Sequence, residues 1–340
     1  MSGVRVASSG RRSAMILALV AIALAIAMVR LAAGRVWTGD GWRLEFGMPE
    51  SAVAGFRLNA LAVASTVGAS LAVSGLFLQG LLRNPLASPF VLGLSSGATL
   101  GLAVAMWLAL AFGFAPFAGL GSVVPAFAGA MGTLAIVSLA GRRRGGLDPI
   151  TLVLAGVVVS SVCGALLMLV HHLLPPGTRG DLIAWTMGRI DEQPDPRLLA
   201  GAATILVATV MLGWWLARSL DVALLGDDEA RSVGLGLGAW RWGLLIGAGV
   251  LAASAVAIAG PIAFVGLVAP HAARILVGPA HRWLVPASAL CGAILLVGAD
   301  VARQPIDLGA GRLPIGVLTA ILGGPAFLWL LHRGRLEGWS

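Results

Sequence analysis

Few side chains that could do chemistry lie within the apolar stretches of this sequence. His171 and His172 are the most suggestive, because histidine side chains can ligate a metal or a haem. Adjacent residues of a helix point about 100° apart, so the two rings cannot both face one site. An interfacial pair without special chemistry is the simpler interpretation, and the ligand role stays an alternative. Cys163 and Cys291 also lie in apolar runs, where buried thiols are typical and neither a zinc site nor a disulfide framework is indicated.

Asp300 is the only carboxylate that lies clearly inside an apolar run. Ionisable groups in membrane segments are candidates for function by default. Arg303 follows three residues later, and residues at this spacing are neighbours on a helix. The spacing therefore favours an ion pair near the outer end of a helix over a free, functional acid.

Motifs of enzyme chemistry are absent from the sequence. There is no G-x-S-x-G, no H-E-x-x-H and no pair of carboxylates at metal-ligand spacing in an apolar run. All 23 basic residues are arginines. A P-loop ATPase needs the lysine of G-x-x-x-x-G-K-[ST], so a separate subunit must bind any ATP that powers this protein. We therefore expect no catalytic residues, no metal ligands and no cofactor bound by this chain.

The composition places these residues in a membrane. Hydrophobic residues make up 58% of the 340 residues, charged residues only 11%, and the mean hydropathy is +0.94. Water-soluble domains are roughly half apolar and a quarter charged. Apolar runs of about 20 residues without period-2 alternation predict transmembrane helices rather than strands. We expect an all-α polytopic membrane protein, a single transmembrane domain over residues 1–340. The ten expected spans are 14–33, 58–79, 91–112, 118–140, 150–173, 198–217, 240–259, 262–277, 283–303 and 314–332.

Two boundaries between these spans depend on glycine and proline. Residues 84–141 carry no charge and are too long for one crossing, so a break is expected near 113–117. Gly260-Pro261 marks a second break, although such a pair can also kink a helix without ending it.

The arginines predict the orientation of the chain in the membrane. Arg11 and Arg12 precede the first apolar run, which is longer than a usual signal-peptide core and is therefore expected to remain as a helix. With a cytoplasmic N-terminus, the inside loops hold most arginines, including the run from Arg142 to Arg144. Both termini are then cytoplasmic. The net charge of +8 is spread over loops that flank the membrane, so lipid rather than nucleic acid is the expected contact.

A polar turn separates two apolar runs at Arg83-Asn84-Pro85. Asn-Pro favours a turn and stops a helix, so the simplest interpretation is a cytoplasmic helical hairpin. Gly97 and Gly101 follow as a G-x-x-x-G pair, which allows two helices to pack closely.

Four separated stretches of the sequence resemble one protein family. They are LQGLLRNPLASPFVLGLSSGATLG (78–101), LLGDDEARSVGLG (224–236), GPIAFVGLVAPHAARILVG (260–278) and RLPIGVLTAILGGPAFLWLL (312–331). In this order, and with ten spans, they resemble the FecCD-type permease subunits of binding-protein-dependent ABC importers for iron-siderophores, haem and cobalamin. The resemblance covers nearly the whole chain from about Arg57 onward and implies a fold like that of cobalamin-importer permeases.

The resemblance implies a transport complex in the bacterial cytoplasmic (inner) membrane. Two permease subunits, identical or related, would form a pathway at their interface. Two ATP-binding subunits carrying ATP-Mg would drive it, and a substrate-binding protein would deliver the cargo outside. The residues expected beside the pathway or in helix packing are Gln79, Asn84, Pro85, Gly93, Ser96, Gly97 and Gly101. The remaining family motif comprises Gly260, Pro261, Phe264, Gly266, Pro270, His271 and Arg274.

The cytoplasmic loop 219–239 resembles the family's coupling segment, which docks in a cleft of the ATPase. Its three consecutive acids would begin a short helix, where the helix dipole favours negative charge. A well-capped surface helix without a partner is the alternative. The expected coupling residues are Leu225, Gly226, Asp227, Asp228, Glu229, Ala230, Arg231 and Gly234.

Arg57 and Arg303 match family positions that face the binding protein. Arginine suits a bidentate contact with a carboxylate, and ordinary interfacial anchoring is the alternative. The sequence departs from the family in two places: the usual R-L-P-R reads R-L-N-A from Arg57, and Arg312 replaces a usual Glu before L-P-I-G. We therefore expect either the docking geometry or the identity of the docking partner to differ from that of the family.

Two other classes of function are alternatives to an importer, and the cargo has alternatives of its own. An ion-coupled secondary transporter should show internal repeats and several ionisable groups within its spans, whereas this sequence shows one such acid and no clear repeat. An intramembrane enzyme would need a convergent set of catalytic groups. Ferric siderophore is the expected cargo on family frequency alone, with cobalamin or haem as alternatives.

Overall fold

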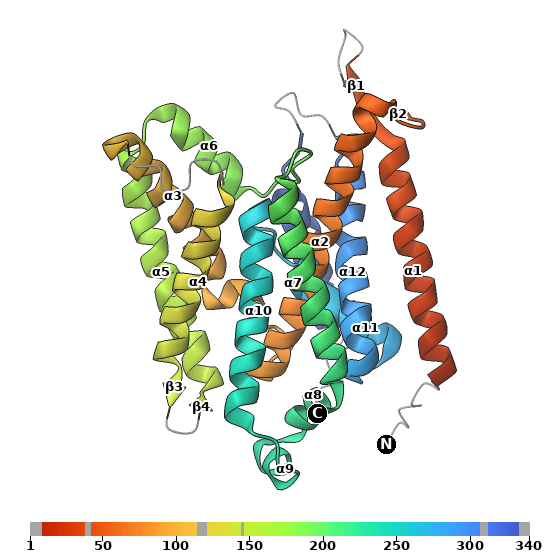
Figure 1. Ribbon diagram of the computed structural model, residues 1–340, viewed down its shortest axis with the longest axis vertical. Coiled ribbons are helices and arrows are strands. Elements are labelled where there is room, and N and C mark those ends of the chain that lie inside the picture. The colour runs from red at the N-terminus through yellow and green to blue at the C-terminus, as the bar shows by residue number, and fades with distance from the viewer. Residues whose placement is uncertain (1–8, 38–41, 114–120, 144–145, 307–311, 333–340) are drawn as a thin grey trace.

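The described part of the chain is predominantly helical, as the sequence predicts. A computed structural model describes residues 9–37, 42–113, 121–143, 146–306 and 312–332 (Figure 1). The α-helices are α1 Ser9–Ala32, α2 Ser51–Leu82, α3 Leu94–Phe112, α4 Val123–Ala140, α5 Pro149–Leu173, α6 Pro176–Thr186, α7 Pro196–Trp215, α8 Ala217–Leu225, α9 Asp227–Ser232, α10 Leu237–Ala259, α11 Val265–Val277, α12 His281–Ala302 and α13 Ile315–His332. A 3₁₀ helix, η1, covers Pro89–Leu92, and the short strands are β1 Ala33–Trp37, β2 Trp42–Phe46, β3 Arg142–Arg143 and β4 Gly146–Leu147.

Ten of the described helices coincide with the ten predicted spans. Eight of them are long and apolar enough to cross a membrane, and α11 and α13 are shorter apolar helices. The break at Gly260-Pro261 is confirmed, because α10 ends at Ala259 and α11 begins only at Val265. At 1.5 Å per residue, the 13 residues of α11 extend about 20 Å, less than a bilayer core of about 30 Å. The break near 113–117 begins at Gly113, which ends α3 with φ 63°, and its remainder lies outside the described residues.

Helix α2 forms the centre of the bundle. It packs against α12, α10 and α11, and most of its residues are buried, whereas few residues of α1, α5 and α7 are buried. Glycines allow the close approach: a Cβ on Gly75 would collide with the carbonyl of Gly266 in α11, and one on Gly68 with the carbonyl of Gly292 in α12. Small residues at such contacts are what packing between membrane helices requires.

Asp-Pro pairs begin two of the outer helices. Asp148 precedes α5 and accepts a hydrogen bond from the backbone N–H of Thr151 at 2.8 Å. The hydroxyl and the backbone N–H of Thr151 lower the pKa of Asp148 below its usual value. Asp195 precedes α7 in the same way and accepts from the N–H of Arg197 at 2.8 Å. An acidic N-cap followed by proline at the first helical position is a favourable helix start.

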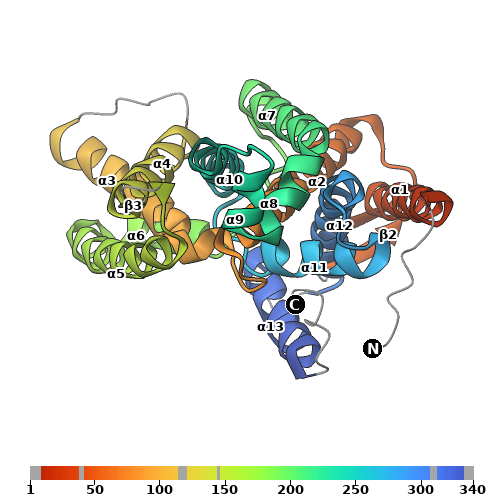
Figure 2. The same ribbon diagram turned by 90° about the horizontal axis from the view of Figure 1, so that it is seen from below.

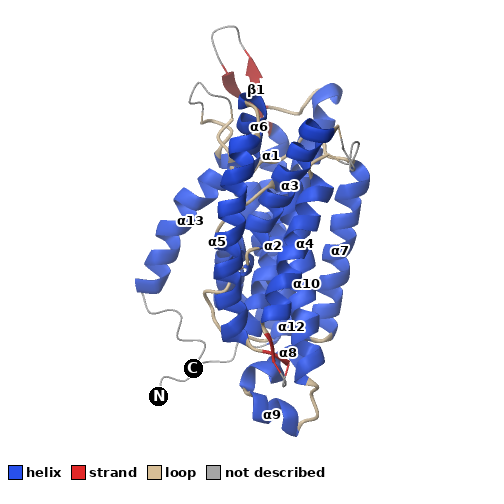
Figure 3. Ribbon diagram, turned by 90° about the vertical axis from the view of Figure 1, so that its left-hand side faces the viewer, coloured by secondary structure: helices blue, strands red, loops and turns tan. Residues whose placement is uncertain are grey.

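The bundle has two distinct ends, which we name by their elements. One end, which we call the hairpin end, carries the β1–β2 hairpin, in which β1 pairs antiparallel with β2 and Gly34 lies opposite Glu45. At the α9 end, α9 forms the tip, with the β3–β4 hairpin at the same end (Figures 1 and 3). Helix α1 begins at the α9 end, and α13 runs toward it. Seen from the α9 end, α13 projects away from the other helices (Figure 2).

Candidate functional site

The predicted coupling segment forms two short helices at the α9 end. Helix α8 carries the chain to Gly226, α9 follows, and the chain returns through Gly234 to α10. Asp228, Glu229, Arg231 and Gly234 are exposed, whereas Ala230 is buried. Side-chain contacts of Leu225 lie outside the described part. The acids do start a helix, as predicted, but their environments differ greatly.

Asp227 points back into the protein rather than outward. Its carboxylate accepts a hydrogen bond from Nη2 of Arg83 at 2.6 Å and two from Nη2 of Arg241 at 2.9 and 3.0 Å. Burial raises the pKa of Asp227, but the charges of Arg241 and Arg83 and their hydrogen bonds outweigh this effect and hold the pKa below its usual value. No local sequence pattern indicates these partners, which are 144 and 14 residues away.

The turn Arg83-Asn84-Pro85 is the helical hairpin that the sequence predicts. Helix α2 ends at Leu82, and Arg83 takes the left-handed conformation with φ 46°. The side-chain oxygen of Asn84 accepts the backbone N–H of Leu86 at 2.9 Å, which stabilises the turn. This turn presents the Arg83 guanidinium to α9.

Two of the predicted packing residues of α3, Gly97 and Gly101, lie in close contact with α4. A Cβ on Gly97 would collide with Thr133 and one on Gly101 with the carbonyl of Pro125. Both glycines also line an apolar groove of about 630 Å³ between α3, α4 and α5. Gly93 begins α3 with φ 77°, and Ser96 is half-buried in its first turn.

Gln79 differs from these packing residues. It lies near the end of α2 with only 2% of its surface exposed. Its side-chain nitrogen has no hydrogen-bond partner among the described residues. A role beside a pathway stays a prediction for this residue.

The motif that begins at Gly260 forms a junction of three backbones. Gly188 has φ 75° and Gly260 has φ 71°, a conformation that favours glycine. A Cβ on Gly260 would collide with the carbonyl of Trp185, whereas one on Gly188 or Gly316 would press on the carbonyl of Pro261. The junction therefore joins the segment after α6, the α10–α11 break and the start of α13.

Phe264 packs against α13 beyond this junction. It is one of two described non-glycine residues with positive φ, at 66°, and it precedes α11. Its side chain lies against Gly323 of α13, where a Cβ would collide with it. Pro270 and His271 are buried in α11, and Arg274 follows in the last turn of that helix. The Nε2 atom of His271 is buried without a hydrogen-bond partner in the described chain.

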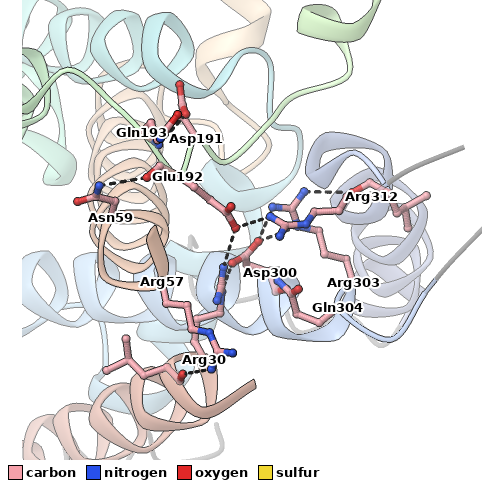
Figure 4. A network of polar contacts seen from close by, with 12 residues as sticks. Arg30, Arg57, Asn59, Asp191, Glu192, Gln193, Asp300, Arg303, Gln304 and Arg312 are labelled. Carbon is pink, nitrogen blue, oxygen red and sulfur yellow. Dashed lines mark hydrogen bonds and ion pairs between the residues drawn. The ribbon is translucent and has the colours of Figure 1, made fainter. Parts of the chain in front are cut away.

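A network of five charged residues closes the hairpin end (Figure 4). Asp300, fully buried in α12, accepts a hydrogen bond from Arg30 of α1, and Nη2 of Arg303 lies 2.6 Å from its other carboxylate oxygen. The predicted ion pair of Asp300 and Arg303 is therefore confirmed. Glu192, in the segment after α6, lies 3.8 Å from Arg30 and forms an ion pair with Arg312.

The two predicted docking arginines are both buried. Arg57 donates from Nη1 to the carbonyl oxygens of Leu31 at 2.7 Å and Ala32 at 3.0 Å. Arg303 donates to Asp300 and, at 3.2 Å, to the carbonyl of Leu313. The exposed fractions of Arg57 and Arg303 are 8% and 5%, so both guanidinium groups hold this chain together in the structure.

The residues at which this chain departs from the family pattern differ in their burial and contacts. Asn59, where the family has proline, donates to the carbonyl of Glu192 at 3.1 Å. Ala60, where the family has arginine, is fully buried. Arg312 and Arg189 are two exposed arginines of this region, with 39% and 53% of their side chains exposed.

Neither the histidine pair nor the two cysteines form a metal centre among the described residues. No group of three His, Cys, Asp or Glu side chains there could hold a metal ion. His172 is exposed and uses its carbonyl to accept from Arg179 at 2.7 Å. Cys163 and Cys291 are buried thiols, as predicted.

The sequence of this chain is similar to those of known transport proteins. Residues 14–333 match the FecCD transport family. The haemin transport system permease HmuU of Yersinia pestis is 38% identical over 82% of this chain and 82% of its own length. The vitamin B12 import permease BtuC of Vibrio cholerae is 36% identical over 93% of each chain. The Fe(3+) dicitrate transport permease FecD of Escherichia coli is 37% identical over 82% of this chain and 85% of its own.

A solved structure shows the same fold. It is described as an inward-facing conformation of a transporter assigned to the metal-chelate type of ABC transporter. It superposes with a TM-score of 0.81 and 28% identity, covering 95% of this chain and 99% of the other. The family match over nearly the full length, together with the ten apolar helices, leads to one conclusion: the chain belongs to the FecCD transport family.

Proposed function

We propose that this protein is the transmembrane permease subunit of an ABC importer for metal chelates. The observation that carries the proposal is the family match over residues 14–333, on a bundle of ten apolar helices. Relatives named for haemin, vitamin B12 and ferric dicitrate transport support metal chelates as the class of cargo. The chain as a whole acts as one transmembrane domain.

ATP is bound and hydrolysed by partner subunits. The absence of lysine from the sequence supports this, because a P-loop requires one. Two ATP-binding subunits contact the α9 end, where α9 presents Asp228, Glu229 and Arg231 to solvent. A second permease copy, identical or related, completes the pathway across the membrane.

The α9 end faces the cytoplasm of a bacterial cell, and the hairpin end faces outward. The arginines support this orientation, because the run that begins at Arg142 and Arg143 lies in the β3–β4 hairpin at the α9 end. Both termini are then cytoplasmic.

A substrate-binding protein docks at the hairpin end. Family resemblance favours Arg57 and Arg303, but their burial means that direct contact requires them to leave their present partners. The exposed Arg312 and Arg189 can meet acidic side chains without such a change. Docking therefore includes Arg312, the residue at which this chain departs from the family.

Ferric siderophore is the proposed cargo within the metal-chelate class, and haem and cobalamin are the alternatives. The ferric dicitrate relative supports iron, but relatives for the other two cargoes match equally well.

An ion-coupled secondary transporter is less well supported. Such a carrier needs an intramembrane acid that can take up and release an ion. Asp300 is already held in ion pairs with both Arg30 and Arg303, so it is not a free acid that an ion could bind.

A pull-down from the native host tests the proposal. The tagged chain is purified in mild detergent from cells grown with and without iron, and its partners are identified. Recovery of a P-loop ATPase, with more of this chain under iron starvation, supports an importer of ferric cargo. Recovery without an iron response keeps the importer and favours cobalamin or another chelate. No ATPase under either condition overturns the proposal.

A further inference from the structure

Asp227 connects α9 to two membrane helices, α2 and α10. Arg83, at the end of α2, donates to its Oδ1 atom at 2.6 Å. Arg241, in the first turns of α10, donates to both of its oxygens at 2.9 and 3.0 Å. One carboxylate therefore joins three elements at the α9 end.

Both arginines extend the connection to further elements. Nη2 of Arg83 also donates to the carbonyl of Ala223 in α8 at 3.1 Å. Nη1 of Arg241 donates to the carbonyl of Leu147 in β4 at 3.3 Å. Helices α8 and α9 are thus joined to α2, α10 and the β3–β4 hairpin that precedes α5.

The neighbouring acid of α9 has no comparable role. Asp228 has 95% of its side chain exposed and, within the described part of the chain, pairs only with Arg231 on the same helix, at 3.3 Å. Its interaction holds no other element to α9. Asp227, by contrast, has 32% of its side chain exposed, and its partner Arg241 only 16%.

The pairing resists separation. Hydrogen bonds between ionised groups are about twice as strong as neutral ones, and a guanidinium that loses its carboxylate while half-buried pays a desolvation cost. Moving α9 away from Arg83 and Arg241 is therefore unfavourable. Moving α9 together with the two arginines keeps these contacts and avoids that cost. Arg83 continues directly from α2, the most buried of the long helices.

We propose that Asp227, held by Arg83 and Arg241, is the link that carries movement of α9 into α2 and α10. The inference rests on the proposed function, because it assigns the movement of α9 to an ATP-binding subunit. Asp227 is a positioning residue in this account: it contacts neither the cargo nor ATP. Its neutral replacement leaves α9 able to bind the ATPase but loosens its hold on the membrane helices.

The test measures cargo transported per ATP hydrolysed. The chain is reconstituted in proteoliposomes with the ATP-binding subunit and the binding protein from its host. The probes are a ferric hydroxamate, haemin and cyanocobalamin, and the assay uses whichever the wild-type complex takes up. For Asp227→Asn we expect this ratio to fall about tenfold while ATP hydrolysis continues, as loss of a charge-assisted hydrogen bond implies. Asp181→Asn, an exposed acid in α6 at the hairpin end, is the matched control.

A second variant separates a link from a merely structural role. Arg83→Gln removes the more exposed partner, with 38% of its side chain exposed, and so disturbs the fold less. Since Arg83 and Asp227 act through one contact, the double variant should be no worse than the poorer single variant. Arg218→Gln, an exposed arginine of α8, is its control.

The outcomes separate the two proposals. A tenfold lower ratio in both single variants, without further loss in the double variant, supports the link. A wild-type ratio in Asp227→Asn and Arg83→Gln, with normal uptake by the wild-type complex, overturns the link alone. Equal loss of uptake and hydrolysis also overturns it, since a failure to assemble then explains the result. Absence of ATP-driven uptake by the wild-type complex overturns the proposed function as well.

Discussion

Nη2 of Arg303 lies 2.6 Å from the carboxylate of Asp300, and both side chains are almost completely buried in the chain. Arg30 donates to the other carboxylate oxygen from a helix 270 residues away in sequence. One buried acid therefore holds two buried arginines, and it ties α1 to α12 at the hairpin end.

Asp300→Asn should destabilise the protein strongly. Removing one partner of a buried ion pair costs about 3–5 kcal/mol, because the remaining charge stays buried and uncompensated. Thermal unfolding in detergent, followed by loss of monodisperse protein, measures the effect. Asp191→Asn is the control, since its ion pair with Arg189 is 3.9 Å long and exposed and should contribute less than about 1 kcal/mol. Equal thermal stability of the two variants would contradict the assigned role of Asp300.

How much of this architecture the sequence predicts depends on the range of the interactions. Hydropathy is local, so the long helices, the break after Ala259 and the turn at Asn84 were all predictable. Helix α6 was not, because its sequence PGTRGDLIAWT has no long apolar run that would predict a helix. Likewise, no local pattern shows that Arg30 reaches Asp300, since nothing near either residue in sequence indicates the other.

The site divides in the same way. Proximity in sequence correctly paired Asp300 with Arg303 and placed the acids of α9 at a helix start. The sequence alone does not distinguish Asp227 from Asp228. In the structure, packing turns Asp227 inward and leaves Asp228 exposed. The burial of Arg57 could not be foreseen either, because it depends on where α1 ends in space.

Gly234→Ala should uncouple ATP hydrolysis from uptake. Gly234 has φ 81°, a conformation that costs other residues about 1–2 kcal/mol, so the turn after α9 should change shape. Gly236→Ala is the matched control, because Gly236 has φ −71° and both positions border open space. Proteoliposomes should show continued ATP hydrolysis with reduced uptake for Gly234→Ala alone. Normal uptake by this variant, or by a bulkier Gly234→Leu, would refute the coupling role of the turn.

Gly101→Ala should weaken the packing of α3 on α4. The added Cβ would collide with the carbonyl of Pro125, and overpacking of this kind costs about 1–3 kcal/mol. A Cβ on Gly132 of α4 meets nothing within 4 Å, so Gly132→Ala should be neutral or stabilise by up to about 1 kcal/mol. Apparent melting temperatures in the same detergent compare the two. A lower value for Gly132→Ala than for Gly101→Ala would show that the helix contact is wrongly placed.

The contact of Asp227 with its arginines should not depend on pH in the physiological range. Burial raises the pKa of Asp227, but the charges and hydrogen bonds of Arg241 and Arg83 lower it by more. The pKa therefore lies below the usual value of about 3.9. A lowered pKa contributes stability that is fully present above the unfolded pKa and is lost as pH falls through the folded one. The ratio of cargo to ATP should therefore be constant from about pH 5.5 to 8. A step in this ratio that Asp227→Asn abolishes would contradict the assigned ionisation.

Uptake by the reconstituted complex tests the central claim most directly. Proteoliposomes containing this chain and its ATP-binding subunit receive cargo from the binding protein, with ATP present or absent and with ion gradients intact or collapsed by ionophores. We predict uptake that requires ATP and the binding protein and that persists without any ion gradient. Uptake that proceeds without ATP and disappears with the gradient would contradict an ABC importer and identify a secondary transporter instead.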